Sequence, residues 1–396
     1  MLVIGLIREG KIPADNRVAL TPAQCRWLLK NTDCRIMVQP SDNRCYLNKE
    51  YARSGVELKE DLSEANLLLG IKEVPVDMLL PGKTYMFFSH TKKKQAYNQK
   101  LMHAMVDKKI TLIDYECLEH EDGQRIIGFG FFAGIVGAHN GFMAYGKRTG
   151  KFSLGRVYEQ KDYRELIHTY FGLKLPPIKI AVTGSGRVAH GIAEIMNLMD
   201  VQEVETDEYM AKQFSYPVYV HLKGATLYTH KEKRTYSRED FHANPQNYEC
   251  LFKPYCFQTD ILMNGVYWDK NIPRLFETDD IKNDSFRIQT IADITDDAFG
   301  SVPINLGDCP MNDPVYGVDK ITGEKTKPYI NTSIDVMAVG NLPNELPRDA
   351  SRFFGEQLIK HVLSDFLKGS SIIENATILE HGKLTDNFEY LKDYAY

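Results

Sequence analysis

The chain has 396 residues and a formal net charge of -5, with 43% hydrophobic and 26% charged residues. This length accommodates two domains with their own cores, and the composition is that of a soluble globular protein. The net charge gives no electrostatic support to a nucleic-acid or anionic-membrane role, so neither partner is expected.

Strand-like and helix-like segments alternate through the first third of the chain. Short, continuous apolar strands separated by helices indicate a parallel α/β sheet that is covered on both faces. In the first helix, Thr21 is the expected N-cap and Pro22 takes the first helical position. The expected strands are 2–7, 34–40, 65–72, 84–90 and 110–116, and the expected helices are 21–32, 49–55 and 96–109.

The N-terminal run is apolar for only a few residues before charges follow, so it is expected to be the first strand rather than a signal peptide. No apolar run approaches about 18 residues, so no transmembrane helix is expected. The seven cysteines are scattered without a C-x-x-C pair. This pattern favours reduced thiols over disulfides or a zinc site, and we expect a cytoplasmic protein without a metal.

The segment 128–150 is apolar and rich in small residues. This pattern is typical of a helix that packs closely against other helices. Two interpretations are open: the helix links two domains, or it is a buried core helix.

A second α/β unit is expected after the sequence KLPP at 174–177, because prolines favour a boundary. Its opening stretch, 178–199, is predicted to form a strand, a glycine-rich turn and a helix. A short second strand is expected at 202–205.

The rest of the chain alternates less regularly. A long, polar surface excursion is expected at 229–248, and strand character returns at 256–268 and 286–295. The segment 348–369 has apolar residues near a 3.6-residue period, which predicts an amphipathic helix that packs back on the first domain.

The stretch GSGRVA at 184–189 matches the dinucleotide fingerprint G-x-G-x-x-A, placed between a strand and a helix. Gly184 permits the tight turn, Gly186 lets the backbone approach a pyrophosphate, and Ala189 lets the helix pack closely. The helix N-terminus supplies free N–H groups and a partial positive charge. A purely structural glycine turn is the alternative.

Two charged residues near this turn bear on the cofactor. Glu205 ends the next strand about 20 residues on, where an acid can take the ribose hydroxyls. Arg187 lies against the pyrophosphate or a 2′-phosphate, or it is a solvated first-turn arginine. The choice between NAD and NADP is left open. The predicted cofactor-binding residues in this part are Gly184, Ser185, Gly186, Arg187, Val188 and Glu205.

Titratable residues end two successive apolar runs. Lys72 and Glu73 follow one expected strand, and His90 ends the next. Ligands of open parallel sheets bind beyond the carboxyl ends of the strands, so these residues face one cleft if the strands are neighbours. A partly desolvated lysine and a histidine then form an acid–base pair for chemistry at a C–N bond. Glu73 tunes the lysine or binds a cationic substrate. Surface exposure and ordinary hydrogen bonding are the alternatives.

Two arginines and a glutamate are further candidates. Arg17 follows the first strand, Arg125 lies in DGQR, and Glu116 ends the strand LIDYE. Guanidinium groups bind carboxylates in a bidentate manner, so the arginines suit a dicarboxylic substrate. Surface salt bridges are the alternative for both.

The order of these motifs resembles that of saccharopine dehydrogenase (lysine-forming), and most of all the lysine–ketoglutarate reductase half of the bifunctional lysine-degradation enzyme. The similar stretches are NRVALTP, GIKEVP, FFSHTKKKQA, LIDYE with DGQR, FGFFAG, GSGRVA, NGVYW, ADIT and NLPNELPRDAS, which run over nearly the whole chain. The arrangement is more distantly similar to the alanine dehydrogenase and transhydrogenase superfamily.

The resemblance implies an α/β protein with two Rossmann-like domains, parallel sheets and an interdomain cleft. Residues 1–150, completed by 342–396, would form the substrate and catalytic domain, and 176–341 the NAD(P)-binding domain. By match of motif, Lys72 and His90 take the places of the family's catalytic acid–base pair. Arg17 and Arg125 match arginines that hold substrate carboxylates, and Glu73, Gln95 and Glu116 match residues that line the cleft. Asn264, Gly265 and Asp293, in NGVYW and ADIT, complete the predicted cofactor-binding set.

One departure concerns the C-terminal part. Where stand-alone saccharopine dehydrogenases carry Asp-His, this chain has Gly340 and Asn341. The family's substrate or nicotinamide contact at this place is therefore not carried over to these two residues.

The expected function is a reversible, NAD- or NADP-dependent reductive condensation of lysine and 2-oxoglutarate to saccharopine through an imine. One alternative is an alanine-dehydrogenase-like or opine-forming reductase with another amine or keto acid. A second is a non-catalytic nucleotide-binding sensor. The sequence leaves open the cofactor, the exact amine, the physiological direction and the oligomeric state, a homo-oligomer included.

Overall fold

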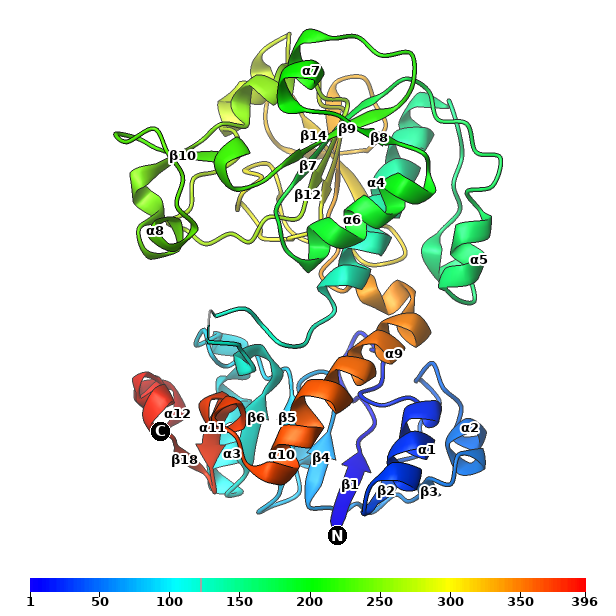
Figure 1. The fold of residues 1–396 in the computed structure, drawn as a ribbon, viewed down its shortest axis with the longest axis vertical. Helices are drawn as coiled ribbons and strands as arrows, with labels where there is room; N and C mark the ends of the chain where they lie inside the picture. Colours follow the sequence, from blue (N-terminus) through cyan, green and yellow to red (C-terminus); the bar gives the residue numbers. More distant parts are fainter. Residues whose placement is uncertain (122) are drawn as a thin grey trace. The chain divides into compact units, whose positions relative to one another are not determined.

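The computed structural model describes residues 1–121 and 123–396 and divides into two compact units. Unit 1 comprises Met1–Phe129 and Pro347–Tyr396, and unit 2 comprises Gly130–Leu346. Each contains an eight-stranded, mostly parallel sheet with helices (Figure 1), which confirms the predicted α/β class and its Rossmann-like character. Among the described residues, none of the helices combines the length and the apolar composition needed to cross a bilayer.

The sheet of unit 1 has the order β18-β17-β6-β5-β4-β1-β2-β3, and only β17 and β18 run antiparallel to their neighbours. The strands are β1 (Leu2–Leu6), β2 (Cys34–Val38), β3 (Glu57–Leu58), β4 (Leu67–Leu69), β5 (Thr84–Phe87), β6 (Thr111–Asp114), β17 (Thr377–Glu380) and β18 (Lys383–Leu384). The C-terminal segment, orange to red in Figure 1, therefore contributes two strands to the sheet of the N-terminal segment.

The helices of unit 1 begin and end where local chemistry favours it. In α1, Thr21 caps the N-terminus in a capping box with Gln24, and Pro22 is the first helical residue, as expected. The helices are α1 (Pro22–Asn31), α2 (Asn48–Arg53), α3 (Gln99–Asp107), α9 (Pro347–Leu358), α10 (Ser364–Lys368), α11 (Ser371–Ala376) and α12 (Lys392–Ala395), with a π-helical segment at Ile359–Leu363 and 3-10 turns at Val76–Met78, Ala96–Asn98, Tyr115–Cys117 and Asp386–Leu391. The predicted helix 348–369 is thus α9, the π segment and α10 in succession.

An aromatic cluster anchors α9 on the N-terminal segment. Phe354 stacks on Phe129 with ring centroids 4.5 Å apart, and it meets Tyr115 edge-on at 5.1 Å. Phe88 lies 5.2 Å from Tyr115 and 6.0 Å from Phe354. This cluster fixes the chain just beyond β5 and β6, where titratable residues follow.

The sheet of unit 2 has the order β15-β14-β16-β13-β12-β7-β9-β8, in which β14 and β15 are antiparallel to their neighbours. The strands are β7 (Lys179–Thr183), β8 (Gln202–Glu203), β9 (Val218–Leu222), β12 (Ile261–Asn264), β13 (Thr290–Asp293), β14 (Val315–Asp319), β15 (Lys325–Thr326) and β16 (Ser333–Met337). The helices are α4 (Gly130–Thr149), α5 (Tyr163–His168), α6 (Arg187–Leu198), α7 (Thr206–Ala211) and α8 (Arg238–Ala243), with 3-10 turns at Val157–Glu159, Gly224–Thr226, Pro245–Asn247, Lys253–Phe257, Thr278–Lys282 and Leu342–Glu345.

The segment 229–248 is more ordered than a polar surface excursion. The strands β10 (Tyr228–His230) and β11 (Tyr248–Cys250) pair in a separate antiparallel sheet. Between them, Phe241 of α8 is buried with its ring centroid 4.5 Å from that of Tyr228. Tyr228, Phe241 and Tyr248 belong to the hydrophobic core of unit 2, so a few apolar residues in a polar stretch are enough to fix it on that core.

Helix α4 packs against α6 within unit 2 through glycines. A Cβ at Gly134 would lie 2.1 Å from the carbonyl oxygen of Val188, and a Cβ at Gly191 would lie 2.1 Å from that of Phe131. Only glycine allows the two backbones to approach so closely. Because α4 belongs to unit 2, the first segment of unit 1 ends at Phe129, whereas the sequence analysis placed this boundary at residue 150.

Candidate active site

The carboxyl ends of β1, β4, β5 and β6 lie at one edge of the sheet of unit 1, because these four strands are adjacent and parallel. β4 pairs directly with β5, so the expected neighbourhood of the Lys72 and His90 strands is confirmed. Each of these strands is followed within a few residues by a titratable side chain. These are Glu9, Lys72, Glu73, His90 and Glu116.

Lys72 lies just beyond β4 with its side chain only partly exposed. Burial, reinforced by the nearby charge of Arg17, lowers the pKa of Lys72 to about 8. A lysine with such a pKa is a mixture of ammonium and neutral amine near neutral pH. It can therefore both give and take a proton there.

Glu9, after β1, fixes the backbone at Lys72. Its carboxylate accepts the backbone N–H groups of Ile71 at 2.7 Å and of Lys72 at 2.9 Å. Burial and the repulsion of Asp15 raise the pKa of Glu9 to about 8, although these two hydrogen bonds act to lower it. The sequence reasoning missed Glu9, although the rule that found Lys72 and His90, a titratable residue after an apolar strand, applies to it equally.

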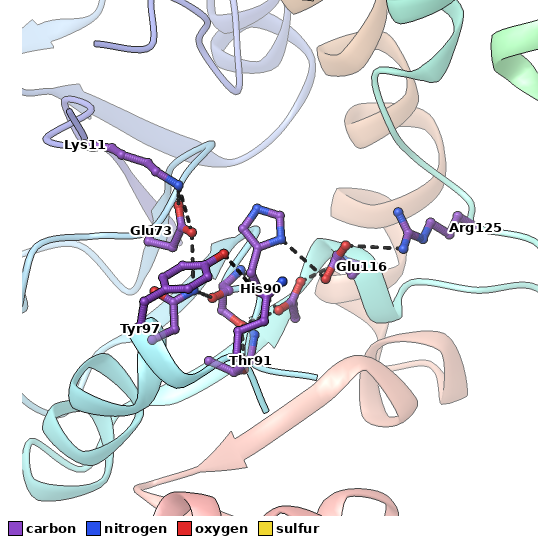
Figure 2. Close-up of polar contacts among 11 residues, drawn as sticks. Lys11, Glu73, His90, Thr91, Tyr97, Glu116 and Arg125 are labelled. Atoms are coloured by element: carbon purple, nitrogen blue, oxygen red, sulfur yellow. Dashed lines mark hydrogen bonds and ion pairs between the residues drawn. The ribbon is translucent and has the colours of Figure 1, made fainter. Parts of the chain in front are cut away.

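Glu73 is held by partners from elsewhere in unit 1. Both of its carboxylate oxygens accept hydrogen bonds from Lys11 Nζ, at 3.0 and 2.8 Å (Figure 2). Asn98 Nδ2 also donates to the carboxylate of Glu73, at 3.3 Å. Burial acts to raise the pKa of Glu73, but the bonds from Lys11 bring it below its ordinary value. Glu73 is thus an ionised partner of Lys11, which the sequence did not single out.

His90 is presented in an uncommon backbone conformation, with φ of +51°. Its neighbours hold it there: Ser89 Oγ lies 2.7 Å from Thr91 Oγ1, and the backbone N–H of Ser89 donates to Asp114 at 3.1 Å. The imidazole stacks on Phe88 with 6.3 Å between ring centroids. Its Nδ1 lies 3.6 Å from Glu116 Oε2, as Figure 2 shows.

Glu116 links His90 to Arg125. Arg125 donates to the other carboxylate oxygen of Glu116 at 3.2 Å (Figure 2), and its own side chain is 46% exposed. Burial would raise the pKa of Glu116, yet the contact with His90 and the charge of Arg125 lower it to about 2. Glu116 is therefore a carboxylate at any ordinary pH and places a negative charge beside the imidazole of His90.

Glu116→Gln is expected to lower the free energy of unfolding at pH 7 by about 1–3 kcal/mol, because a charged hydrogen-bond partner is lost. The pKa of Glu116 falls from 4.5 in the unfolded chain to about 2, so its contribution is complete above pH 4.5 and disappears as the pH falls towards 2. Urea unfolding of both proteins at several pH values measures the difference.

The matched control is Glu119→Gln. Glu119 pairs with Lys92 at 2.9 Å, but about a third of each side chain is exposed, so the loss should stay below about 0.5 kcal/mol. A Glu116→Gln difference that did not shrink with falling pH would contradict the expected ionisation.

The structure gives Arg17 and Gln95 partners within unit 1. Arg17 is buried and forms a bidentate ion pair with Asp15, at 3.0 and 2.6 Å. Its guanidinium carbon also lies over the Phe129 ring, 4.2 Å from the ring centroid. The side chain of Gln95 accepts from the hydroxyl of Tyr97 at 2.7 Å. Arg17 also affects the pKa of Lys72, which places its charge near the strand ends.

The glycine turn of unit 2 has the expected local geometry. Gly184 adopts φ of +105°, and a Cβ there would lie 2.5 Å from the carbonyl oxygen of Gly265. Gly186 is the N-cap of α6, and a Cβ there would meet nothing within 4 Å. Ala189 is fully buried against the sheet. The backbone at Gly186 is thus open to a ligand, and the N-terminus of α6 begins beside it together with Ser185, Arg187 and Val188.

Asn264 and Asp293 lie side by side on β12 and β13 and are fully buried. Asn264 donates to Asp293 at 2.8 Å and accepts from Thr183 at 2.7 Å, and Asn305 donates to the other oxygen of Asp293 at 2.8 Å. Burial raises the pKa of Asp293 to about 6 in spite of these bonds. This network joins the ends of β7, β12 and β13 and positions Gly265 next to Gly184.

The strand order places Glu205 away from the glycine turn. β8, which precedes it, does not pair with β7 but forms the edge of the sheet beyond β9. Glu205 is exposed at the N-cap of α7, and the strand before it is separated from β7 by β9. On that side β7 pairs with β9, which ends in Leu222 and is followed by Lys223; neither residue was among the predicted site residues.

The structure therefore brings together, in unit 1, Lys72, Glu73, His90 and Glu116, with Arg125 reached through Glu116. Unit 2 brings together the glycine turn, Gly265, Asn264 and Asp293, and leaves Glu205 apart. All the expected catalytic and substrate-binding residues lie in unit 1, and all the expected cofactor-binding residues lie in unit 2.

Comparisons with known proteins confirm the resemblance found in the sequence. Residues 5–136 match the family model of the alanine dehydrogenase/PNT N-terminal domain. Over 98% of its length the chain is 28% identical to the mitochondrial alpha-aminoadipic semialdehyde synthase of Rattus norvegicus, but it spans only 47% of that protein, about half the length. It is 24% identical to saccharopine dehydrogenase [NAD(+), L-lysine-forming] of Emericella nidulans, with 90% of each chain covered.

Solved structures agree with the fold. L-alanine dehydrogenase matches 100% of both chains with a TM-score of 0.67 at 15% identity. A transhydrogenase from Sinorhizobium meliloti matches 97% of this chain and 100% of its own with a TM-score of 0.59 at 12% identity. At these identities the likeness supports the two-domain, Rossmann-like architecture.

Proposed function

We propose that this chain, which is similar to the saccharopine dehydrogenases, is an NAD(P)-dependent oxidoreductase that acts at a CH–NH bond. The reaction is the reversible, reductive condensation of lysine with 2-oxoglutarate through an imine. The observation that carries this proposal is a lysine with its pKa lowered to about 8 at the same sheet edge as a carboxylate-supported histidine.

The residues of unit 2 fit a reduced dinucleotide. The open space at Gly186, the N-terminus of α6 behind it and the absence of a side-chain cap there suit a pyrophosphate. The glycine turn, with Ser185, Arg187 and Val188, would hold it. When bound, the reduced nicotinamide supplies the hydride that converts an imine into a secondary amine.

Imine formation needs two proton transfers that Lys72 and His90 can supply. The neutral amine of Lys72 takes a proton from the substrate ammonium, which frees the nitrogen lone pair to attack the keto carbon. The imidazolium of His90, stabilised by Glu116, gives a proton to the hydroxyl of the carbinolamine, which leaves as water. The C–O bond breaks and the C=N bond forms with no net gain or loss of electrons.

The positive charges around these two groups suit an acidic substrate. Arg17, Lys11 and Arg125 surround the strand ends, each already paired with a carboxylate of the protein. A substrate carboxylate can share such a cation or displace its partner, and a bidentate arginine orients it. A keto acid with two carboxylates is the class that this arrangement favours.

The test is an assay of NADPH and NADH oxidation by the purified chain with lysine and 2-oxoglutarate. Turnover that requires both substrates is expected. Turnover with pyruvate or with other amines instead would replace the saccharopine assignment by an alanine-dehydrogenase-like or opine-forming one. Dinucleotide binding by folded protein without turnover on any keto acid and amine would overturn the enzyme and leave a nucleotide-binding sensor.

A further inference from the structure

The loop between β5 and α3 carries two of the predicted site residues. His90 opens it and Gln95 closes it, and we call residues 90–95 the His90 loop. His90 and Lys94 both adopt left-handed backbone conformations, with φ of +51° and +53°. Residues other than glycine keep such conformations only where the surrounding structure imposes them. The His90 loop therefore depends on contacts that hold its backbone in shape.

One set of contacts comes from the N-terminal segment itself. Thr91 Oγ1 lies 2.7 Å from Ser89 Oγ, and the backbone N–H of Lys94 donates to the carbonyl oxygen of Thr91 at 2.9 Å. Lys92 Nζ pairs with Glu119 at 2.9 Å. These contacts fix the first part of the loop next to the ends of β5 and β6.

A second set of contacts comes from two tyrosines far along the chain. The hydroxyl of Tyr390 donates to the carbonyl oxygen of Lys92 at 3.0 Å, across 298 positions in sequence. The hydroxyl of Tyr394 donates to the carbonyl oxygen of Gln95 at 2.7 Å, across 299 positions. Because both acceptors are backbone carbonyls, the two hydroxyl groups hold the path of the main chain on either side of Lys94.

An ion pair lies between the two tyrosine contacts. Both carboxylate oxygens of Asp393 accept hydrogen bonds from Lys94 Nζ, at 2.9 and 3.0 Å. The side chain of Asp393 is 79% exposed, and exposed ion pairs contribute little. The hold on the loop is therefore expected to come mainly from the two tyrosines.

The segment 386–396, which carries these tyrosines, is anchored by apolar burial. Phe388, Leu391 and Ala395 are buried, and so is most of Tyr394. This burial keeps the segment in place without help from the tyrosine hydroxyls. The hydroxyl groups are then available to act on the His90 loop, and a phenylalanine in their place keeps the anchor.

We propose that Tyr390 and Tyr394 are positioning residues for the proposed reaction. Their hydroxyl groups fix the His90 loop, and thereby the direction from which the imidazole of His90 meets the substrate. A displacement of about 1 Å in a catalytic group can cost about 100-fold in rate. The inference rests on the proposed function, which gives His90 a proton transfer, but the hold on the loop can also be measured without turnover.

The kinetic test is the double variant Tyr390→Phe/Tyr394→Phe, which removes both hydroxyl groups and keeps both rings. Its kcat, per folded protein as measured by circular dichroism, should fall by about 10- to 100-fold. The Kd of the reduced dinucleotide, measured by its fluorescence, should stay the same, because the predicted cofactor-binding residues lie in unit 2. Asp393→Asn should lower kcat by less than about twofold, since that ion pair is exposed.

The NMR signal of the His90 imidazole, identified by its loss in His90→Gln, gives a readout without substrate. It should shift or broaden in the double variant. Tyr396→Phe is the matched control, because the hydroxyl of Tyr396 accepts a hydrogen bond from the backbone N–H of Leu384 at 3.0 Å, outside the loop. This variant should keep both the wild-type kcat and the wild-type His90 signal.

Wild-type kcat in the double variant would overturn the inference and leave the proposed function standing. An equal loss of kcat in Tyr396→Phe would also overturn it, because the hydroxyl groups would then act on the segment as a whole. A wild-type protein without turnover overturns the proposed function instead. In that case a moved His90 signal in the double variant supports the hold on the loop, and an unmoved signal overturns it as well.

Discussion

Lys72→Met is expected to lower kcat/KM for the reductive condensation by about 10²–10⁴-fold, the usual contribution of a general acid–base group. Methionine keeps the length of the side chain and removes the group that takes the amine proton. In the wild type, the neutral amine of Lys72 becomes available as the pH rises through about 8, and kcat/KM should rise with it. The variant should lose this part of the pH profile, which steady-state kinetics between pH 6 and 9 would show.

The same substitution should not weaken the fold. The pKa of Lys72 is lowered from 10.5 to about 8 in the folded protein, so folding disfavours its ammonium form. That penalty is complete below pH 8 and vanishes as the pH rises to 10.5. Lys72→Met removes it, so the variant should be as stable as the wild type or more so at pH 7, as measured by urea unfolding. Lost activity with retained stability is typical of a functional residue.

Lys83→Met is the matched control, because Lys83 directly precedes β5 at the opposite edge of the same sheet. Its activity should stay within a factor of about two of the wild type, since surface changes cost little. An active Lys72→Met enzyme with an unchanged pH profile would remove Lys72 from the mechanism.

Gly184→Ala and Gly186→Ala should separate the two roles of the glycine turn. At Gly184, an alanine meets both φ of +105° and a backbone oxygen at 2.5 Å, so the free energy of unfolding should fall by about 2–5 kcal/mol. At Gly186, φ is -90° and the added Cβ meets nothing, so stability should change by less than about 0.5 kcal/mol.

For cofactor binding, Gly186→Ala should have a large effect although it leaves stability almost unchanged. Gly186→Ala places a methyl group where a pyrophosphate would approach the backbone, and the Kd of the reduced dinucleotide should rise by about 10-fold or more. Fluorescence titration and urea unfolding of the same samples measure both quantities. Unchanged dinucleotide binding by the stable Gly186→Ala protein would mean that the turn is purely structural.

Much of unit 1 could be predicted because its signals are local. The strands end in charged groups directly after apolar runs, and parallel strands bring such ends to one edge, so Lys72 and His90 follow from the pattern. The capping box at Thr21 and Gln24 is likewise a matter of spacing. Glu9 also follows an apolar strand, β1, so the same rule would have predicted it if it had been applied to the first strand.

The features of the fold and the site that were not predicted depend on contacts between residues far apart in sequence, which local patterns do not contain. Lys11 reaches Glu73 over 62 positions in sequence, and Glu73 then acts as its ionised partner. The place of β9 beside β7 depends on which of two short strands pairs with the central one, and neither periodicity nor the fingerprint decides that. Glu205 ends the next strand along the chain, but the structure places that strand at the edge of the sheet, beyond β9. The boundary between the two units at Gly130 also depends on how α4 packs. The small residues of α4 permit close packing, but they do not specify which element it packs against.

The return of the C-terminal segment to unit 1 has a consequence for the order in which the chain folds during synthesis. Unit 2 is continuous from Gly130 to Leu346, so it can fold as soon as that stretch has been made. Unit 1 begins first but lacks β17 beside β6 and Phe354 beside Phe129 until the last part of the chain is complete. Until then β6 is an unpaired edge next to exposed aromatic rings, a surface prone to aggregation. Within residues 1–396, the unit whose first strands are made earliest is thus the unit completed last.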